Sequence, residues 1–280
     1  MNDRGLVVRM AFVSTVLFGF YLLLAWIGLS AGLGLPVIIA GLGVFIGIQY
    51  VVGKWSVLYQ VGAKPLPRDE FAAFHAEYER ISEEMGFDEP PRLLVAEMDA
   101  PNAFAVGRKG NGTVVVSPAL LELLDFDEAI GVVAHELAHL KNRDSVIMVV
   151  GESISSIVGW GVFLLGALSD SLIVSIFAWI LGTIAKLFVM IFVLALSRYR
   201  EFAADRDAAR TTGEAQPLAE ALRKIDTHIA EHPPENATAA HVSALCIAPQ
   251  DRGLLATLFS THPSTDRRVE QLESLSVSSQ

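Results

Sequence analysis

Hydrophobic positions in this chain are gathered into four long runs that alternate with two polar regions. The runs cover approximately 10–29, 33–53, 146–168 and 173–196. A helix of about 20 mainly apolar residues crosses the hydrocarbon core of a bilayer, so each run is long enough to span a membrane. Only about three residues separate the members of each pair, which predicts two helical hairpins. The expected parts are an N-terminal hairpin (1–53), a polar segment (54–145), a second hairpin (146–196) and a polar tail (197–280).

Basic residues around the first run allow a second interpretation. Arg4 and Arg9 resemble the start of a cleaved signal peptide, but such peptides have an apolar core of about 7–15 residues, and here a second apolar run follows directly. We therefore expect a retained anchor. With four spans, both polar regions lie on one side of the membrane. Basic residues flank the runs on that side and are missing from both hairpin tips, which predicts a multi-pass protein of the cell membrane with its polar parts in the cytoplasm.

The first polar region predicts a small α+β domain. Apolar residues at helical spacing indicate an amphipathic helix over 68–86, and short β-prone segments at 92–98, 103–106 and 113–117 indicate a small sheet. A further helix is expected to begin with Asp127 as its cap, to extend through Leu140, and to continue into the third apolar run.

The last of these helices carries the sequence VVAHELAHLKNRD. His135 and His139 are four residues apart, so on a helix they project from the same face and can bind one metal ion through imidazole nitrogens. Glu136 lies about 100° around the helix from His135, which suits a general base better than a ligand. Zinc lowers the pKa of a bound water to about 7, and a carboxylate that takes its proton promotes attack on a peptide carbonyl.

A catalytic zinc also needs a third protein ligand, and SRYREFAAD (197–205) follows the last apolar run. Glu201 is the expected ligand, because the hairpin returns the chain to the side of the membrane where His139 lies. Asp205, one helical turn later, is expected to accept the distal N–H of a ligand histidine. Asp144 is the rival ligand, but on a continuous helix it faces away from His139.

Composition narrows the classes of function and of site. The chain is 52% hydrophobic, and its mean hydropathy of +0.45 indicates that part of it faces lipid. A net charge of −10 argues against a nucleic-acid partner, and the single cysteine, Cys246, excludes a cysteine-based zinc cluster. Glu152 and Lys186 fall at similar depths in the second hairpin, so they either pair with each other or extend separately to the membrane surface.

Four strings taken together resemble the HtpX-type membrane heat-shock proteases, which with the CAAX prenyl proteases form a group of gluzincins. The strings are APNAFAVGR (100–108), AHELAHLKNRD (134–144), SRYREFAAD (197–205) and THPSTDRRV (261–269). The resemblance implies one Zn²⁺ per chain, bound by His135, His139 and Glu201, with Glu136 as base.

The same resemblance implies roles for residues that the pattern alone does not single out. His262 and Arg268 would stabilise the oxyanion of the scissile carbonyl. Asn102, Ala103 and Phe104 would line the cleft on an edge strand that pairs with the substrate backbone. Ser264 stands where the family usually has a second proline, and this departure affects the rigidity of that loop.

The sequence as a whole predicts an α+β fold with a zincin-like catalytic domain and four transmembrane helices. The site predicts zinc-dependent endoproteolysis at the cytoplasmic face, and the resemblance implies that the substrates are misfolded or damaged membrane proteins. The substrates are proteins or peptides, and the oligomeric state is left open. Processing of prenylated CAAX peptides is an alternative enzyme function, and a non-catalytic membrane scaffold is the alternative from another class. A transporter is disfavoured because the first hairpin has almost no ionisable residues.

Overall fold

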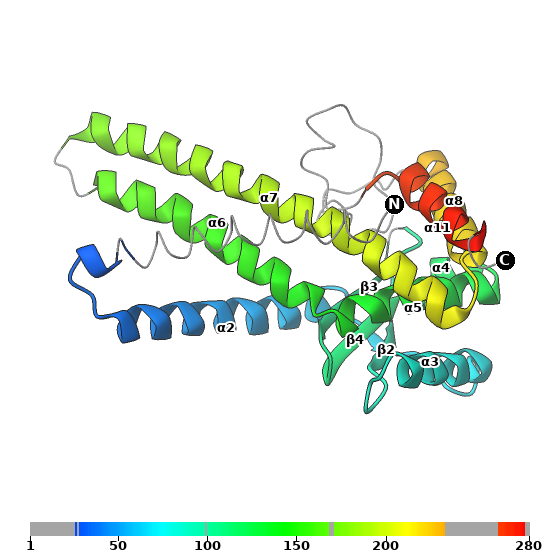
Figure 1. Cartoon of the computed structure of the whole chain (residues 1–280). Helices are drawn as coiled ribbons and strands as arrows, with labels where there is room; N and C mark the ends of the chain where they lie inside the picture. Colours follow the sequence, from blue (N-terminus) through cyan, green and yellow to red (C-terminus); the bar gives the residue numbers. More distant parts are fainter. Residues whose placement is uncertain (1–25, 27, 99, 168–170, 233–262, 278–280) are drawn as a thin grey trace. The chain divides into compact units, whose positions relative to one another are not determined.

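The computed structural model describes residues 26, 28–98, 100–167, 171–232 and 263–277. The chain divides into two compact units. Unit 1 comprises Met1–Gly53 and Val146–Ser197, and unit 2 comprises Lys54–Ser145 and Arg198–Gln280. Unit 2 has mixed α and β structure, whereas the described part of unit 1 is helical (Figure 1).

A four-stranded sheet forms the β part of unit 2. Its strands are β1 (Lys64–Pro65), β2 (Arg92–Val95), β3 (Ala103–Arg108) and β4 (Asn111–Val116), in the spatial order β1-β2-β4-β3. Strand β4 runs parallel to β2 and antiparallel to β3, with Ala103 opposite Val116, while β1 is antiparallel to β2. Strand β3 therefore lies at one edge of the sheet.

Side chains alternate between the two faces of this sheet, as a period of two residues requires. Phe104, Val106 and Val115 lie in a small apolar cluster with Leu58 and Met98 on one face. The other face belongs to the main core, whose sheet residues are Leu93, Ala103, Val114 and Val116. Burial on both faces explains why β4 reads as a continuous run of valines.

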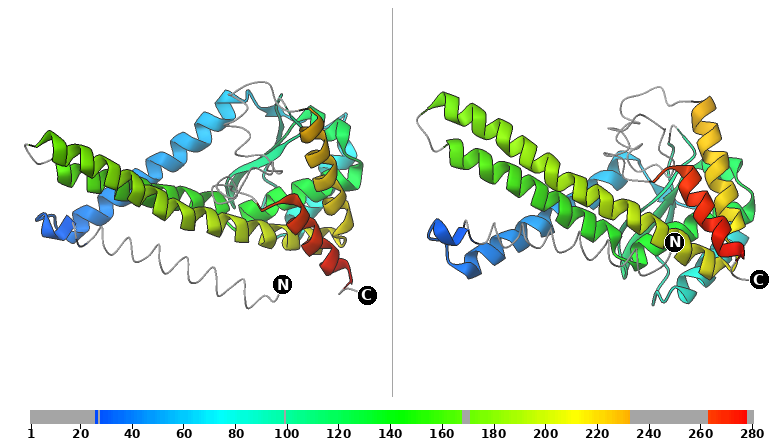
Figure 2. Two further views of the ribbon diagram at one scale, coloured as in Figure 1. Left: turned by 90° about the horizontal axis from the view of Figure 1, so that it is seen from above. Right: turned by 45° about the horizontal axis from the view of Figure 1, so that its top comes forward.

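Helices cover the main-core side of the sheet. They are α3 (Ala72–Glu84), α4 (Pro118–Leu123), α5 (Phe126–Lys141), the end of α7 (Leu172–Thr212), α8 (Gln216–Glu231) and α11 (Thr265–Val277). Helix α5 is central, since it packs on β3, β4, α3 and α8. Helix α8 turns Leu218, Leu222 and Ile225 inward, and α11 lies beside it (Figure 2). The close approach of α5 and α8 places Gly131 against the backbone of Leu218.

The ends of α5 differ from the sequence prediction. Asp125, not Asp127, caps the helix: its side chain accepts a hydrogen bond from the third helical N–H, and Glu128 accepts one from the backbone N–H of Asp125. Helix α5 stops at Lys141, and Arg143 takes up a left-handed φ of 58° before α6 (Asp144–Ala167) begins. The expected uninterrupted helix into the third apolar run is therefore wrong.

The described helices of unit 1 are α2 (Leu35–Gln60) and the parts of α6 and α7 within this unit. Helices α6 and α7 lie side by side (Figures 1 and 2), and glycines bring their backbones into contact. A Cβ added at Gly182 would stand 2.4 Å from the carbonyl oxygen of Gly159, and one added at Gly151 would meet Val193 at 2.9 Å. Such small-residue packing is common between membrane helices.

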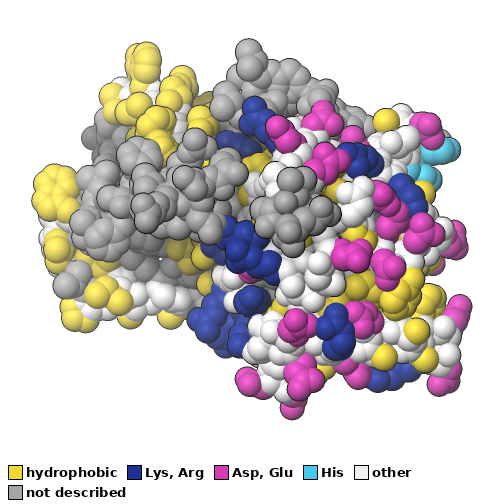
Figure 3. All heavy atoms as spheres, turned by 45° about the vertical axis from the view of Figure 1, so that its right-hand side comes forward, with side chains coloured by type: hydrophobic (Ala, Val, Ile, Leu, Met, Phe, Trp, Pro, Cys, Tyr) yellow, Lys and Arg dark blue, Asp and Glu magenta, His cyan; other side chains and the backbone are white. Residues whose placement is uncertain are grey.

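Large apolar side chains are exposed along α2 and α7, including Val37, Ile48, Phe177, Trp179 and Ile184. The space-filling view shows hydrophobic side chains over the visible part of unit 1 and intermixed acidic and basic side chains over unit 2 (Figure 3). Within the described residues, α6 over Asp144–Phe163 and α7 are long and apolar enough to cross a membrane.

Several sequence predictions for unit 1 fall outside what the structure describes. Nearly all of the first apolar run (10–29) lies there, and so does the side chain of Glu152. Lys186 is exposed on α7. Four membrane spans and a Glu152–Lys186 pair therefore stay predictions.

Candidate metal centre

Two histidines on α5 form the base of the candidate site. Residues Glu128–Ala138 of this helix are all buried, which includes His135, whereas His139 is partly exposed. The rings of His135 and His139 lie edge to face with centroids 4.6 Å apart. Their Nε2 atoms approach to 3.0 Å. The four-residue spacing therefore produces the convergence that the sequence predicted.

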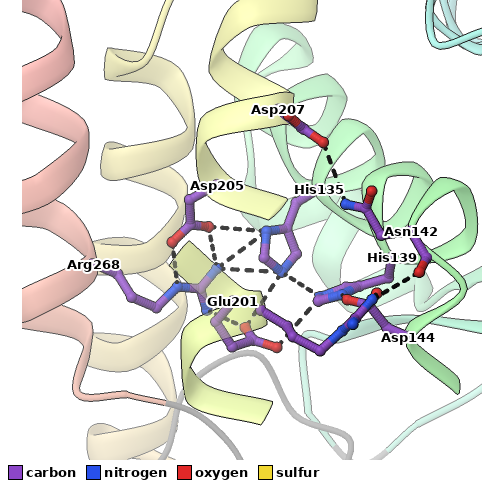
Figure 4. A network of polar contacts seen from close by, with 9 residues as sticks. His135, His139, Asn142, Asp144, Glu201, Asp205, Asp207 and Arg268 are labelled. Carbon is purple, nitrogen blue, oxygen red and sulfur yellow. Dashed lines mark hydrogen bonds and ion pairs between the residues drawn. The ribbon is translucent and has the colours of Figure 1, made fainter. Parts of the chain in front are cut away.

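The third potential ligand, a carboxylate, comes from the C-terminal part of α7. One carboxylate oxygen of Glu201 lies 3.3 Å from Nε2 of His139, and the other lies 3.5 Å from Nε2 of His135 (Figure 4). Glu201 itself is only 3% exposed. All three ligand-type atoms lie within 4.8 Å of one another, although more than 60 residues separate the two helices' contributions along the chain.

These positions fit a bound divalent ion. Ligand atoms at about 2.1 Å from one zinc and at tetrahedral angles lie about 3.4 Å from each other. The two Nε2 atoms lie 3.0 Å apart, and their contacts of 3.3 and 3.5 Å with the two oxygens of the Glu201 carboxylate are close to that value. Imidazole nitrogens with one carboxylate are also a donor set typical of catalytic zinc sites.

Each histidine uses its other nitrogen to contact a carboxylate. Nδ1 of His135 lies 2.9 Å from Asp205, which is completely buried. Nδ1 of His139 lies 2.6 Å from Asp144. A carboxylate that accepts the Nδ1 proton fixes the tautomer with Nε2 unprotonated and facing the metal position. Asp205 lies where the sequence predicted, but Asp144 is next to the outer nitrogen of His139 and not among the inner ligand atoms.

Arg268 of α11 contacts two of the buried carboxylates. Its Nε and Nη2 donate to the two carboxylate oxygens of Asp205 at 2.9 and 2.6 Å, and Nη1 lies 3.4 Å from Glu201. Arg268 is 0% exposed. Burial opposes its charge, but Asp205 and Glu201 outweigh that cost and raise the pKa of the guanidinium. Arg268 of α11 therefore joins two carboxylates that are both supplied by α7.

The same charges act on the imidazoles of the metal-free protein. Burial and the positive charge of Arg268 oppose protonation of His135, but Asp205 offsets both and raises its pKa. Burial likewise opposes protonation of His139, and Glu201 and Glu136 raise the pKa of that ring. The site thus attracts positive charge, as a cation site must.

The remaining predicted residues are placed as follows. Glu136 is buried on α5, and its charge acts on both His139 and Arg268. Asn102 is fixed beside the start of β3, since its backbone N–H donates to Oγ of Ser117 and its carbonyl accepts from the Ser117 N–H, both at 2.9 Å. Ala103 and Phe104 are buried in β3. His262 lies outside the described residues.

Comparison with known proteins agrees with this geometry. The model of Peptidase family M48 matches residues 68–276. The chain belongs to this peptidase family. A protease HtpX homolog of Halobacterium salinarum is 41% identical over 290 residues, which is 95% of this chain and 100% of the relative. Another from Acidiphilium cryptum is 36% identical over 258 residues, or 88% of each protein. The resemblance to HtpX-type proteases is thereby confirmed.

A solved structure shares the fold at lower sequence identity. The crystal structure of S. mikatae Ste24p matches with a TM-score of 0.59 and 16% identity, covering 97% of this chain and 67% of that protein. Family membership makes the chain a metalloprotease, and its apolar helices agree with a membrane protein. The metal in this family is generally zinc.

Sequence reasoning missed the part played by Asp144. On a continuous helix its carboxylate would point away from His139, but the left-handed residue Arg143 ends that helix and turns the chain. Left-handed backbone is uncommon for residues other than glycine, so the sequence gives little warning of this turn. The Asn142-Arg143 pair just after the last periodic residue was the available signal, because asparagine often marks helix ends.

Proposed function

We propose that this protein is a zinc-dependent endopeptidase of the cell membrane that degrades misfolded or damaged membrane proteins. The convergence of His135, His139 and Glu201 beside the buried Glu136 is the observation that carries the proposal. One zinc ion per chain would be held by the two Nε2 atoms and the Glu201 carboxylate.

Zinc, when bound, supplies Lewis-acid chemistry that lowers the pKa of water and polarises the peptide carbonyl. Glu136 accepts the proton of the attacking water on its carboxylate and delivers it to the leaving nitrogen. Asp205 keeps the Nδ1 proton on His135, so the ring presents its lone pair at Nε2. His262 stabilises the developing oxyanion.

For Arg268 the contacts support a role different from the oxyanion role implied by the resemblance. The guanidinium is fully buried, and it is bonded through Nε and Nη2 to Asp205. We assign it to holding Asp205 and Glu201 in position.

The edge strand β3 supplies the surface for substrate. The backbone N–H of Ser117, just after β4, donates to the carbonyl of Asn102, just before β3. In an antiparallel ladder the hydrogen-bonded pairs alternate, so the backbone amides of Phe104 and Val106 also point toward β4. The N–H and C=O groups of Ala103 and Ala105 face the edge at which no further strand lies among the described residues, and there an extended peptide can pair. Since backbone pairing reads little sequence, cleavage is loosely specific, which suits disposal of damaged proteins.

The membrane arrangement completes the proposal. Four helices anchor the chain, and the catalytic unit lies on the cytoplasmic side. The exposed apolar side chains of α2 and α7 support the lipid-facing surface, and the basic residues that flank the apolar runs support the orientation.

Replacing the base while keeping the ligands tests this function. We expect Glu136→Gln in the detergent-purified protein, loaded with one equivalent of zinc, to lose about 10²–10⁴-fold of its casein cleavage rate, because proton transfer is removed. Zinc content should be unchanged. Glu122→Gln, an exposed glutamate on α4, is the matched control and should cleave like the wild type. Equal cleavage by Glu136→Gln and wild type, or no cleavage by zinc-loaded wild type, would favour a non-catalytic scaffold.

A further inference from the structure

The two ligand histidines are supported by parallel sets of residues. Asp205 contacts Nδ1 of His135, and Arg268 forms an ion pair with Asp205. Behind His139 stands Asp144, and the guanidinium of Arg200 forms an ion pair with the second oxygen of that carboxylate. The sequence pattern predicted the contact of Asp205 with a ligand histidine, but it predicted neither arginine in this supporting position.

Arg200 also contacts the turn that positions Asp144. Its Nη2 donates to the backbone carbonyl of Asn142 at 2.8 Å, and the same guanidinium pairs with Asp144. These partners flank Arg143, the residue with left-handed φ. Arg200 therefore connects both sides of the turn that brings Asp144 back to His139.

Position in the chain links this contact to the metal ligands. Arg200 precedes Glu201 on α7, so one helix supplies the third ligand and also holds the residue that orients His139. Arg200 and Asp144 are 8% and 7% exposed. A buried carboxylate needs partners at both oxygens, since an uncompensated buried charge is costly. Nδ1 of His139 contacts one oxygen of Asp144, and the guanidinium of Arg200 forms an ion pair with the other.

We infer that Arg200 is a positioning residue of the metal centre, which acts through Asp144 to fix the ring of His139 for metal binding. The inference rests on the proposed function for the identity of the metal, but it concerns binding and not cleavage. Residues that orient a ligand from outside the coordination sphere typically contribute 10–100-fold to metal affinity.

Zinc affinity of the full-length protein in detergent is the measurement that tests this inference. Competition with a coloured zinc chelator should show about tenfold weaker binding for Arg200→Gln. Arg200→Lys can pair with Asp144 but has no planar fork to contact Asn142 as well, so a smaller loss is expected. Arg210→Gln, an exposed arginine on the same helix, is the matched control and should bind zinc like the wild type.

A double-mutant cycle separates action through Asp144 from general damage to the fold. In an Asp144→Asn background, Arg200→Gln should weaken zinc binding by less than about twofold, because the residue it acts through is already altered. Equal losses in both backgrounds would overturn the inference, and so would wild-type affinity in Arg200→Gln. Failure of the proposed function would look different, since zinc-loaded wild type would then bind metal without cleaving casein.

Discussion

The two units of this chain place polar and apolar side chains in opposite ways. In unit 1, exposed residues include Ile184 and Phe177, and the helices meet through glycines. In unit 2, charged groups such as Asp205 and Arg268 are completely buried, among apolar side chains of the main core. Exposed apolar side chains in unit 1 suit contact with lipid. Buried charged side chains in unit 2 suit a site that binds a cation.

The two units differ most in their buried charged side chains, so removing one member of a buried ion pair should cause the largest loss of stability. Arg268→Met would leave Asp205 as an uncompensated buried carboxylate, so we expect a loss of about 3–5 kcal/mol in the stability of unit 2. The exposed Arg223–Glu273 pair is the matched control, and Arg223→Met should cost less than about 1 kcal/mol. Thermal unfolding in detergent, followed by circular dichroism, measures both. Equal midpoints would mean that the buried network contributes no more than a surface pair.

A second test compares an apolar side chain that is buried in unit 2 with one that is exposed in unit 1. Ile225 of α8 is 0% exposed, and Ile225→Ala should cost about 2–5 kcal/mol through lost contacts and a cavity. Ile184 of α7 is 57% exposed, so Ile184→Ala should change stability by less than about 0.5 kcal/mol in detergent. Unfolding midpoints of the two variants decide the point. Similar losses would show that Ile184 packs against protein and not against lipid.

Helix contacts within unit 1 provide the smallest expected effect. Gly182→Ala places a methyl group 2.4 Å from the carbonyl oxygen of Gly159, so α6 and α7 must move apart, at a cost of about 1–3 kcal/mol. Gly161→Ala is the matched control, because no described residue outside its own helical turn lies within 4 Å of the added Cβ. It should be neutral or slightly stabilising, since alanine favours the helix. The free energies of unfolding of the two variants are compared in mixed micelles. Equal values for Gly182→Ala and Gly161→Ala would argue against close packing of α6 and α7 through glycines.

The sequence predicted those parts of the structure that depend on local periodicity. The spacing of His135 and His139 fixes a shared helix face, and a hairpin that returns the chain to its starting side favours Glu201 as their partner. Strand β1 was not predicted, because two residues including Pro65 carry no periodic signal. Arg200 was not predicted either, since its contact with Asp144 depends on a left-handed turn and on tertiary packing of α7.

The central claim is that His135, His139 and Glu201 form one zinc site, and metal content after a chelator wash tests it most directly. Wild-type protein should retain one zinc per chain, as should Glu214→Gln, which alters an exposed glutamate beyond the end of α7. Glu201→Gln should lose most of its zinc under the same wash, because the amide is a weak ligand for this ion. Equal zinc retention in Glu201→Gln and Glu214→Gln would contradict the account.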